Sequence, residues 1–128
     1  MPVSCSPQKV FVSAGEPSGD IYASALMREL SLHWPSAEWF GCTGPRMRDA
    51  GVRTILDQAE LSVVGLVEVL SHLPRIYGHY RRLQRQIRAE RPDLAILTDS
   101  PDFHLRLAAR LREMKVPVIY LVAPQAWA

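Results

Sequence analysis

Two short stretches of the sequence carry side chains that could take part in catalysis. The first combines two glycines, a hydroxyl and two carboxylates within six residues, Gly15-Glu16-Pro17-Ser18-Gly19-Asp20. Glycines permit a tight turn and let a ligand approach the backbone, and a helix that follows such a turn attracts anions to its N-terminus. Two carboxylates would repel a plain phosphate, so this loop favours a polyhydroxylated ligand or a catalytic role.

The second stretch is Asp99-Ser100-Pro101-Asp102-Phe103, which follows an apolar run. We expect Asp99 at the carboxyl end of a strand, where a carboxylate can act as a general base on a substrate hydroxyl if its pKa is raised. The alternative for Asp99 is a turn, because Asp and Ser are common before proline. Asp102 is suited to cap the following helix or to lie in its first turn. His104 could face the crevice, but a lone histidine near a helix start is more often on the surface, and that is where we expect it.

A further glycine turn, Gly44-Pro45-Arg46-Met47, places a proline at an expected first helical position. Arg46 could bind a phosphate at this helix N-terminus, or it could be an ordinary exposed arginine. The first loop also has a structural alternative, because Ser18 and Asp20 are both good N-cap residues.

Apolar strands and amphipathic helices alternate along the chain and must position these residues. The expected strands are Val10–Ala14, Glu38–Thr43, Arg53–Leu56, Leu94–Thr98 and Val116–Val122. The expected helices are Ile21–His33, Arg46–Ala50, Leu70–Glu90 and Phe103–Met114. This alternation predicts an α/β fold with a Rossmann-like parallel sheet and helices on both faces. Ligands of such sheets bind at the carboxyl ends of the strands, so the Gly15 loop and Asp99 should face one crevice.

A crowded apolar stretch, Leu61 to Leu73, contains only one charged residue, Glu68, and leads into the longest expected helix. Six arginines follow it, at positions 75, 81, 82, 85, 88 and 91. The stretch is too short to span a bilayer. An apolar patch beside arginines suits an anionic membrane surface or a substrate with acyl chains and a phosphate. The alternative is a buried helix with a solvated basic face.

Length and composition indicate one ordinary globular domain, with 128 residues, 48% hydrophobic and 22% charged. A net charge of only +2 gives no argument for nucleic-acid binding. Cys5 and Cys42 lack metal-site spacing, and no signal peptide precedes them, so a reduced cytosolic compartment is expected. The sequence stops just after an apolar strand, with Trp127 near its end, and we therefore expect it to be part of a longer protein.

Five motifs, in this order and at these spacings, resemble the N-terminal part of the lipid-A-disaccharide synthase family. They are Gly15 to Asp20, Gly44 to Met47, Val64-Gly65-Leu66-Val67-Glu68-Val69-Leu70, Asp99 to Phe103, and Pro124-Gln125-Ala126-Trp127-Ala128. Any one of them is a weak signal, but five in register are specific. The resemblance covers nearly the whole chain from Lys9 onward. It implies an inverting glycosyltransferase of the GT-B type that serves outer-membrane biogenesis in Gram-negative bacteria.

The family joins UDP-2,3-diacylglucosamine to 2,3-diacylglucosamine 1-phosphate, forming a β-1,6-linked disaccharide and UDP. The resemblance implies that Asp99 is the catalytic base that deprotonates the acceptor 6-hydroxyl, and that Ser18 also lies in the active site. The residues expected to bind substrate are Gly15, Glu16, Gly19, Asp20, Arg46 and Asp102. No metal or cofactor is needed in the GT-B plan, where a helix N-terminus and basic groups stabilise the leaving diphosphate.

The resemblance also assigns the apolar stretch to acyl-chain and membrane contact. The residues expected at this surface are Leu66, Val67, Leu70, Leu73, Ile76 and Tyr77. The implied location is cytoplasmic, peripheral on the inner membrane of a Gram-negative bacterium, with no nucleic-acid partner.

Two residues depart from the family pattern: His104 stands where asparagine is usual, and Ala123 where serine is usual. A GT-B enzyme has two Rossmann-like domains, and residues 1–128 would be an incomplete N-terminal, acceptor-side one, without the nucleotide-binding C-terminal domain. We therefore expect the chain alone to be inactive. Two other functions stay open: another GT-B enzyme acting on a UDP-sugar, such as a 2-epimerase, and a non-enzymatic Rossmann-like binding module.

Overall fold

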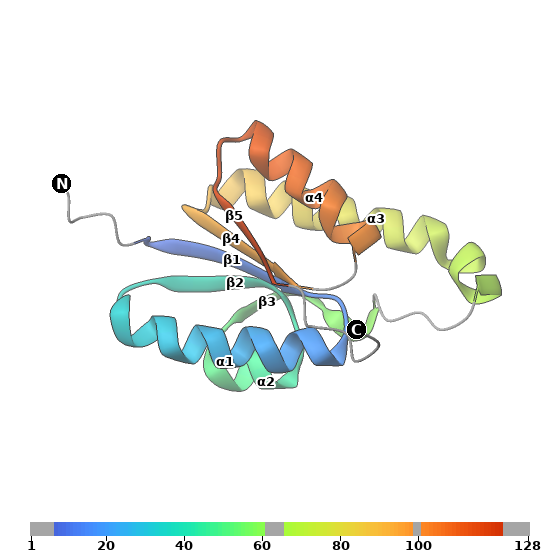
Figure 1. Cartoon of the computed structure of the whole chain (residues 1–128). Coiled ribbons are helices and arrows are strands. Elements are labelled where there is room, and N and C mark those ends of the chain that lie inside the picture. The colour runs from blue at the N-terminus through green and yellow to red at the C-terminus, as the bar shows by residue number, and fades with distance from the viewer. Residues whose placement is uncertain (1–6, 61–65, 99–100, 122–128) are drawn as a thin grey trace, which may run out of the picture.

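The computed structural model describes residues 7–60, 66–98 and 101–121, and only the backbone of 66–76 and 101–102 (Figure 1). In chain order the elements are β1 (Lys9–Ala14), α1 (Pro17–His33), β2 (Glu38–Thr43), α2 (Pro45–Ala50), β3 (Arg53–Asp57), the 3-10 turn η2 (Gln58–Glu60), α3 (Leu66–Glu90), β4 (Leu94–Thr98), α4 (Pro101–Glu113) and β5 (Val118–Leu121). This order confirms the predicted alternation of strands and helices.

The strands form one sheet in the order β3-β2-β1-β4-β5, and each neighbouring pair is parallel. Helices α1 and α2 cover one face of the sheet, and α3 and α4 cover the other (Figure 1). The chain moves outward from β1 to β3, then crosses back through α3 to β4 on the other side of β1. The predicted Rossmann-like fold with helices on both faces is therefore confirmed, and its strand order reverses between β1 and β4.

Alternate residues of the central strands pack into two separate hydrophobic cores, because successive strand side chains point to opposite faces. On the α3 and α4 face, the buried residues include Phe11, Phe40, Leu97, Leu83, Ile87, Leu107 and Leu111. On the α1 and α2 face, they include Val10, Val12, Ile96, Ala23, Met27 and Met47. Residues four apart on α3 and on α4 share the inward face, as helical periodicity requires.

Helices α1 and α4 begin earlier than expected, and each has a proline at its first residue. Pro17 opens α1 where Ile21 was expected, and Pro101 opens α4 where Phe103 was expected. A proline has no N–H and has a fixed φ near the helical value, so the first turn of a helix accepts it. Much of the Gly15-to-Asp20 stretch is therefore the first turn of a helix rather than a loop.

Helix α3 also begins before its expected start, at Leu66 instead of Leu70, and it continues through Pro74. Its first part extends beyond the sheet, on the side where α1 begins (Figure 1). Helix α2 ends at Gly51 in the left-handed conformation (φ 109°), as the sequence predicted. Within the described residues, no helix is long and apolar enough to cross a membrane.

Candidate active site

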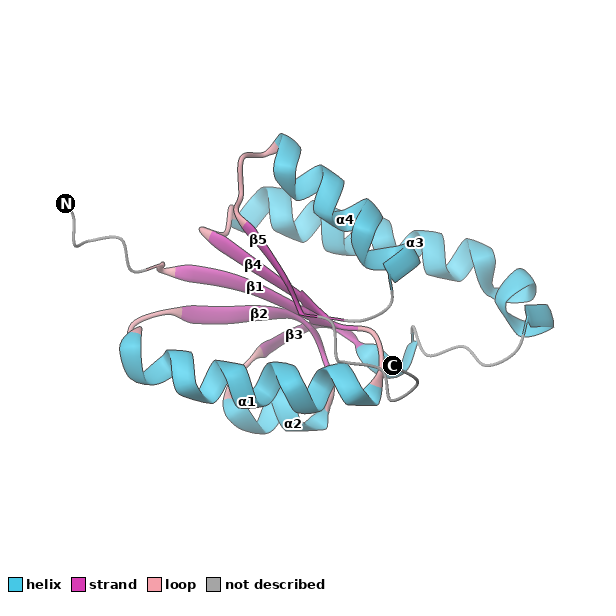
Figure 2. Ribbon diagram, in the orientation of Figure 1, coloured by secondary structure: helices cyan, strands magenta, loops and turns pink. Residues whose placement is uncertain are grey.

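The last residues of β1 and β4 lie side by side at the point where the strand order reverses. Ala14 is the register partner of Thr98, so Gly15 and Asp99 each come directly after a member of this pair. After β1 the chain enters α1 on one face of the sheet, and after β4 it enters α4 on the opposite face (Figure 2). Connections that diverge in this way open a crevice at the carboxyl edge of a parallel sheet. The candidate site is placed here.

Some of the expected site residues fall outside the described part of the chain. Asp99 lies in the segment 99–100, which the structure does not describe, and nothing is described of the Asp102 side chain. Their roles as general base and substrate contact therefore stay predictions.

The first turn of α1 presents a hydroxyl and a carboxylate at this edge of the sheet. Glu16 is the N-cap residue, with extended backbone (φ −142°, ψ 160°), and its side chain makes no capping hydrogen bond. Glu16 and Ser18 are both exposed, whereas Gly15 and Gly19 are buried. The alternative that Ser18 or Asp20 caps α1 is wrong, because Glu16 occupies that position. The helix N-terminus beside these side chains attracts negative charge.

Asp20 points away from solvent and caps a different helix, α2. Its Oδ2 accepts a hydrogen bond from the backbone N–H of Arg46 at 3.0 Å, and its Oδ1 accepts one from Met47 at 2.9 Å. The residue is only 3% exposed. A Cβ at Gly44 would overlap with this carboxylate, so the close approach requires glycine there. Asp20 therefore joins the start of α1 to the start of α2, and its expected contact with substrate stays a prediction.

Arg46 offers its side chain but not its backbone to a ligand. Its guanidinium is exposed, while its N–H is already bonded to Asp20. The expected phosphate site at the N-terminus of α2 would thus have to use the side chain, because a buried carboxylate occupies the helix end. The charge of Asp20 also opposes a second anion at this end of α2.

The structure shows a buried polar cluster at this edge that the sequence analysis did not predict. Ser13, Thr98 and His104 are each at most 1% exposed. His104 was expected on the surface, and that expectation is wrong. His104 shares the inward face of α4 with Leu107 and Leu111, because it lies three and seven residues before them. This helical spacing was the signal that could have identified it.

Helix α3 presents basic side chains to solvent. Arg81, Arg82, Arg85 and Arg88 are exposed, whereas Leu83 and Ile87 are buried against the sheet. Tyr77 is 60% exposed, and the Arg81 guanidinium carbon lies 5.8 Å from the centre of its ring. The second half of α3 therefore matches the alternative of a buried stripe with a solvated basic face.

The remaining residues expected at the lipid-contact surface lie in the first half of α3. Nothing is described of the side chains of Leu66, Val67, Leu70, Leu73 and Ile76. Their expected contact with acyl chains and membrane stays a prediction.

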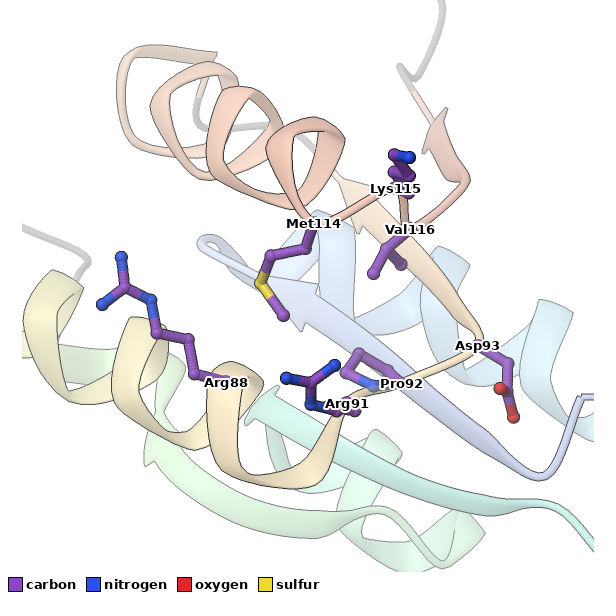
Figure 3. A pocket seen from close by; sticks show the side chains of 7 residues that line it. All are labelled: Arg88, Arg91, Pro92, Asp93, Met114, Lys115 and Val116. Carbon is purple, nitrogen blue, oxygen red and sulfur yellow. The ribbon is translucent and has the colours of Figure 1, made fainter.

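One pocket lies at the opposite, amino-terminal edge of the sheet (Figure 3). Its lining residues are Arg88, Arg91, Pro92, Asp93, Met114, Lys115 and Val116. Arg91 is the first residue after α3 and Lys115 the second after α4, and cations at these places offset the negative ends of the helix dipoles. Asp93 Oδ2 accepts bonds from the backbone N–H groups of Gln8 and Lys9. The Asp93 carboxylate therefore has a structural role, and the pocket lies at the edge of the sheet opposite to the candidate site.

Among the described residues, no group of three histidine, cysteine or acidic side chains is placed to hold a metal ion. The described residues at this edge of the sheet offer hydroxyls, carboxylates and a helix N-terminus to a ligand.

Comparison with known proteins identifies relatives along nearly the whole chain. Residues 10–128 match the family model described as lipid-A-disaccharide synthetase. Proteins named lipid-A-disaccharide synthase are similar to it: that of Solibacter usitatus is 67% identical over 120 residues, that of Koribacter versatilis 48% over 121, and that of Nitrosococcus oceani 46% over 119.

These alignments cover 94%, 94% and 93% of this chain, but only 32%, 32% and 31% of the respective relatives. The chain therefore spans about a third of the length of the curated relatives it matches.

Proposed function

The chain belongs to the lipid-A-disaccharide synthase family, and we propose that it forms the acceptor-binding part of a glycosyltransferase of lipid A biosynthesis. The whole enzyme would transfer 2,3-diacylglucosamine from UDP to the 6-hydroxyl of 2,3-diacylglucosamine 1-phosphate. The products are the β-1,6-linked disaccharide and UDP. The observation that carries this proposal, beyond the family match, is that Gly15 and Asp99 directly follow register partners where the strand order reverses.

In this mechanism Asp99 is the general base. Its carboxylate takes the proton of the acceptor 6-hydroxyl as that oxygen attacks the anomeric carbon of the donor, and the UDP phosphate departs from the opposite face. Attack opposite the leaving group inverts the configuration at the anomeric carbon. A positioned general base contributes typically about 10²- to 10⁴-fold to the rate.

The start of α1 would hold the acceptor sugar. Ser18 and Glu16 are exposed in its first turn, where a hydroxyl and a carboxylate can bond to sugar hydroxyls. Gly15 and Gly19 are buried, and their lack of a side chain lets the chain turn tightly between β1 and α1. Asp20 stabilises this turn through the hydrogen bonds that it accepts from the start of α2. Arg46 is exposed, and its backbone is bonded to Asp20 of this turn. Its guanidinium would contact the acceptor phosphate.

Helix α3 would place the site at a membrane. Its amino-terminal half carries the apolar residues Leu66, Val67, Leu70, Leu73 and Ile76 in sequence, and the exposed Tyr77 and Arg81 follow. Apolar side chains beside arginines suit the surface of an anionic bilayer. We place the enzyme on the cytoplasmic face of the inner membrane of a Gram-negative bacterium.

A chimera tests the proposal as a whole. In it, this chain replaces the matching third of the Solibacter usitatus relative, with which it is 67% identical. The chimera should form the disaccharide from the two substrates, and the 128-residue chain alone should form none. A chimera that folds but makes no disaccharide, while the intact relative does, would show that the chain does not serve this reaction.

The alternatives raised from the sequence have no observation in their favour. The three relatives compared above are all named lipid-A-disaccharide synthase. Neither a 2-epimerase nor a non-enzymatic binding module is therefore proposed.

A further inference from the structure

A buried hydrogen bond joins β1 to α4 near the carboxyl edge of the sheet. Ser13 Oγ lies 2.7 Å from Nε2 of His104, and both residues are fully buried. Ser13 is two residues before Gly15, and His104 is the fourth residue of α4. The bond therefore connects the strand that leads to the Gly15 turn with the helix that follows the Asp99 segment.

A second bond ties β4 into the same cluster. Thr98 Oγ1 donates to the backbone carbonyl of Ser13 at 3.1 Å. Ser13 thus meets α4 through its side chain and the last residue of β4 through its main chain. The three polar residues link the elements on both sides of the point where the strand order reverses.

Aromatic contacts hold the His104 ring on two sides. The centre of the Phe103 ring lies 5.5 Å from the centre of the imidazole, and that of the Tyr120 ring lies 6.3 Å from it, both edge to face. Phe103 also meets Tyr80 of α3 edge to face at 5.8 Å. Rings packed in this way restrict the orientation of the imidazole, so its Nε2 is held toward Ser13.

Polar groups are costly to place among the apolar residues of this core. Ser13 faces the same side of the sheet as Phe11, where Leu107 and Leu111 are packed. A buried polar side chain lowers stability unless it is bonded, while an apolar pair of the same shape can be nearly neutral. A buried polar bond has a fixed length and direction, which apolar contacts lack. Its effect here is to fix how α4 begins relative to the end of β1.

We propose that His104 is a positioning residue for the transfer reaction. Its bond to Ser13 holds the first turn of α4 at a set distance from the end of β1, and so sets the width of the crevice. This inference rests on the proposed function, because it assumes that the acceptor binds there. A displacement on the order of 1 Å in an active site can lower the rate about a hundredfold.

Four variants of the chimera test this role. Ser13→Ala and His104→Phe each remove the bond, and His104→Phe keeps a ring next to Phe103 and Tyr120. Each should lower kcat about tenfold, with KM within about twofold of the parent. The double variant should lose no more than the worse single variant, because both changes remove one bond. His104→Gln should keep kcat within about threefold of the parent chimera, since the amide nitrogen of glutamine can occupy the position of Nε2 and bond to Ser13.

Thr54→Val is the matched control. It removes the 2.8 Å bond between the Thr43 and Thr54 hydroxyls, which joins β2 to β3 and involves neither β1, β4 nor α4. It should lower the thermal midpoint without changing kcat. All rates are measured well below the thermal midpoint of each variant, so that a loss of folded enzyme does not lower them.

Amide hydrogen exchange gives a readout that does not need turnover. In Ser13→Ala, the amides of the first turns of α4 should exchange about tenfold faster, while those of α1 should be unchanged. The proposal is wrong if kcat stays within about twofold in both single variants, or if their losses multiply in the double variant. It is also wrong if α4 exchange is unchanged. These outcomes do not depend on Asp99: loss of the general-base role would leave the exchange result as it stands.

Discussion

The carboxylate of Asp20, in the first turns of α1, accepts hydrogen bonds from the first turn of α2, including one of 2.9 Å from the N–H of Met47. The two residues are 27 positions apart and lie on different helices. This contact joins α2 to α1, the helix that follows the Gly15 turn. It explains why a stretch that looks like a ligand loop also carries a buried acid.

Replacement of Asp20 by alanine should destabilise the chain. The change leaves two N–H groups of α2 without their charged acceptor, and such bonds contribute about 1.5–3 kcal/mol each before relaxation. We expect a loss of about 2–4 kcal/mol in the free energy of unfolding, measured by urea denaturation of the 128-residue chain. Asp49→Ala, at an exposed position of α2, is the control and should change the free energy of unfolding by less than about 0.5 kcal/mol. Equal effects of both substitutions would contradict the capping role.

Gly44 should tolerate alanine only when Asp20 is also shortened. Its φ of −103° suits any residue, so the obstacle is the overlap of a new Cβ with the Asp20 side chain, including its Cβ at 2.7 Å. Gly44→Ala alone should therefore destabilise the chain, and its added effect should be much smaller in an Asp20→Gly background, where that side chain is absent. Urea denaturation of the two single variants and the double variant measures this. Strictly additive effects would show that the two residues do not interfere.

Gly78 is the matched control for this prediction. A Cβ there meets nothing within 4 Å, and the residue lies within α3. Gly78→Ala should raise the free energy of unfolding by about 0.5–1 kcal/mol, because alanine loses less backbone entropy in a helix. A loss of stability at this position would indicate contacts that the described residues do not show.

Glu90 should make the stability of the chain sensitive to acid. Its carboxylate accepts hydrogen bonds from Lys9 at 2.9 Å and from Arg53 at 3.1 Å, which lower its pKa below the ordinary value of 4.5. The folded state thus favours the ionised form. This contribution is complete above pH 4.5 and is lost as the pH falls through the lowered folded-state pKa.

In Glu90→Gln, the unfolding free energy should fall less between neutral and acid pH than it does in the parent chain. The pKa of Lys9 is raised above its ordinary value of 10.5, and the largest cause is the hydrogen bond to Glu90. The contribution of Lys9 to stability is therefore lost only when the pH rises through this raised pKa. Denaturation curves at a series of pH values measure the loss of unfolding free energy on both the acid and the alkaline side. An unchanged loss on the acid side in Glu90→Gln would remove Glu90 as the cause.

The exposed arginines of α3 should contribute to membrane binding. Arg81→Glu with Arg85→Glu reverses two charges one helical turn apart on an exposed face. Each arginine near an anionic surface contributes about 1 kcal/mol, so binding of the chimera to phosphatidylglycerol vesicles should weaken by at least about tenfold. Cosedimentation at low and high salt measures this.

Arg28→Glu with Arg112→Glu is the matched control for the vesicle experiment, since both residues are exposed on other helices, α1 and α4. It should leave vesicle binding nearly unchanged. An equal loss in both double variants would mean that net charge, and not the α3 face, controls binding.

Much of the sheet could be predicted from the sequence because its signals are local. Strands β2 and β4 were predicted at their observed bounds, and Gly51 was correctly placed at the end of α2. The helix starts were less accurate, because Pro17 and Pro101 were interpreted as loop residues when each occupies a first helical position. A proline is compatible with both, and only the three-dimensional packing decides between them.

The roles of individual site residues were harder to predict, since they depend on partners distant in sequence. Nothing near Asp20 indicates that its carboxylate meets the N-terminus of α2. Likewise, Ser13 and His104 are 91 residues apart, and their bond forms only once β1 and β4 are neighbours. His104 was expected on the surface because it lies near a helix start, and its helical spacing to the buried Leu107 and Leu111 was not used.

The general-base role of Asp99 is the central claim, and one substitution tests it most directly. In the chimera, Asp99→Asn keeps the size of the side chain but removes its ability to accept a proton. We predict that kcat for disaccharide formation falls at least about a hundredfold, while KM for both substrates changes little. Asp49→Asn, at an exposed position on α2, should leave kcat unchanged. A kcat for Asp99→Asn equal to that of the parent chimera would contradict the proposed mechanism.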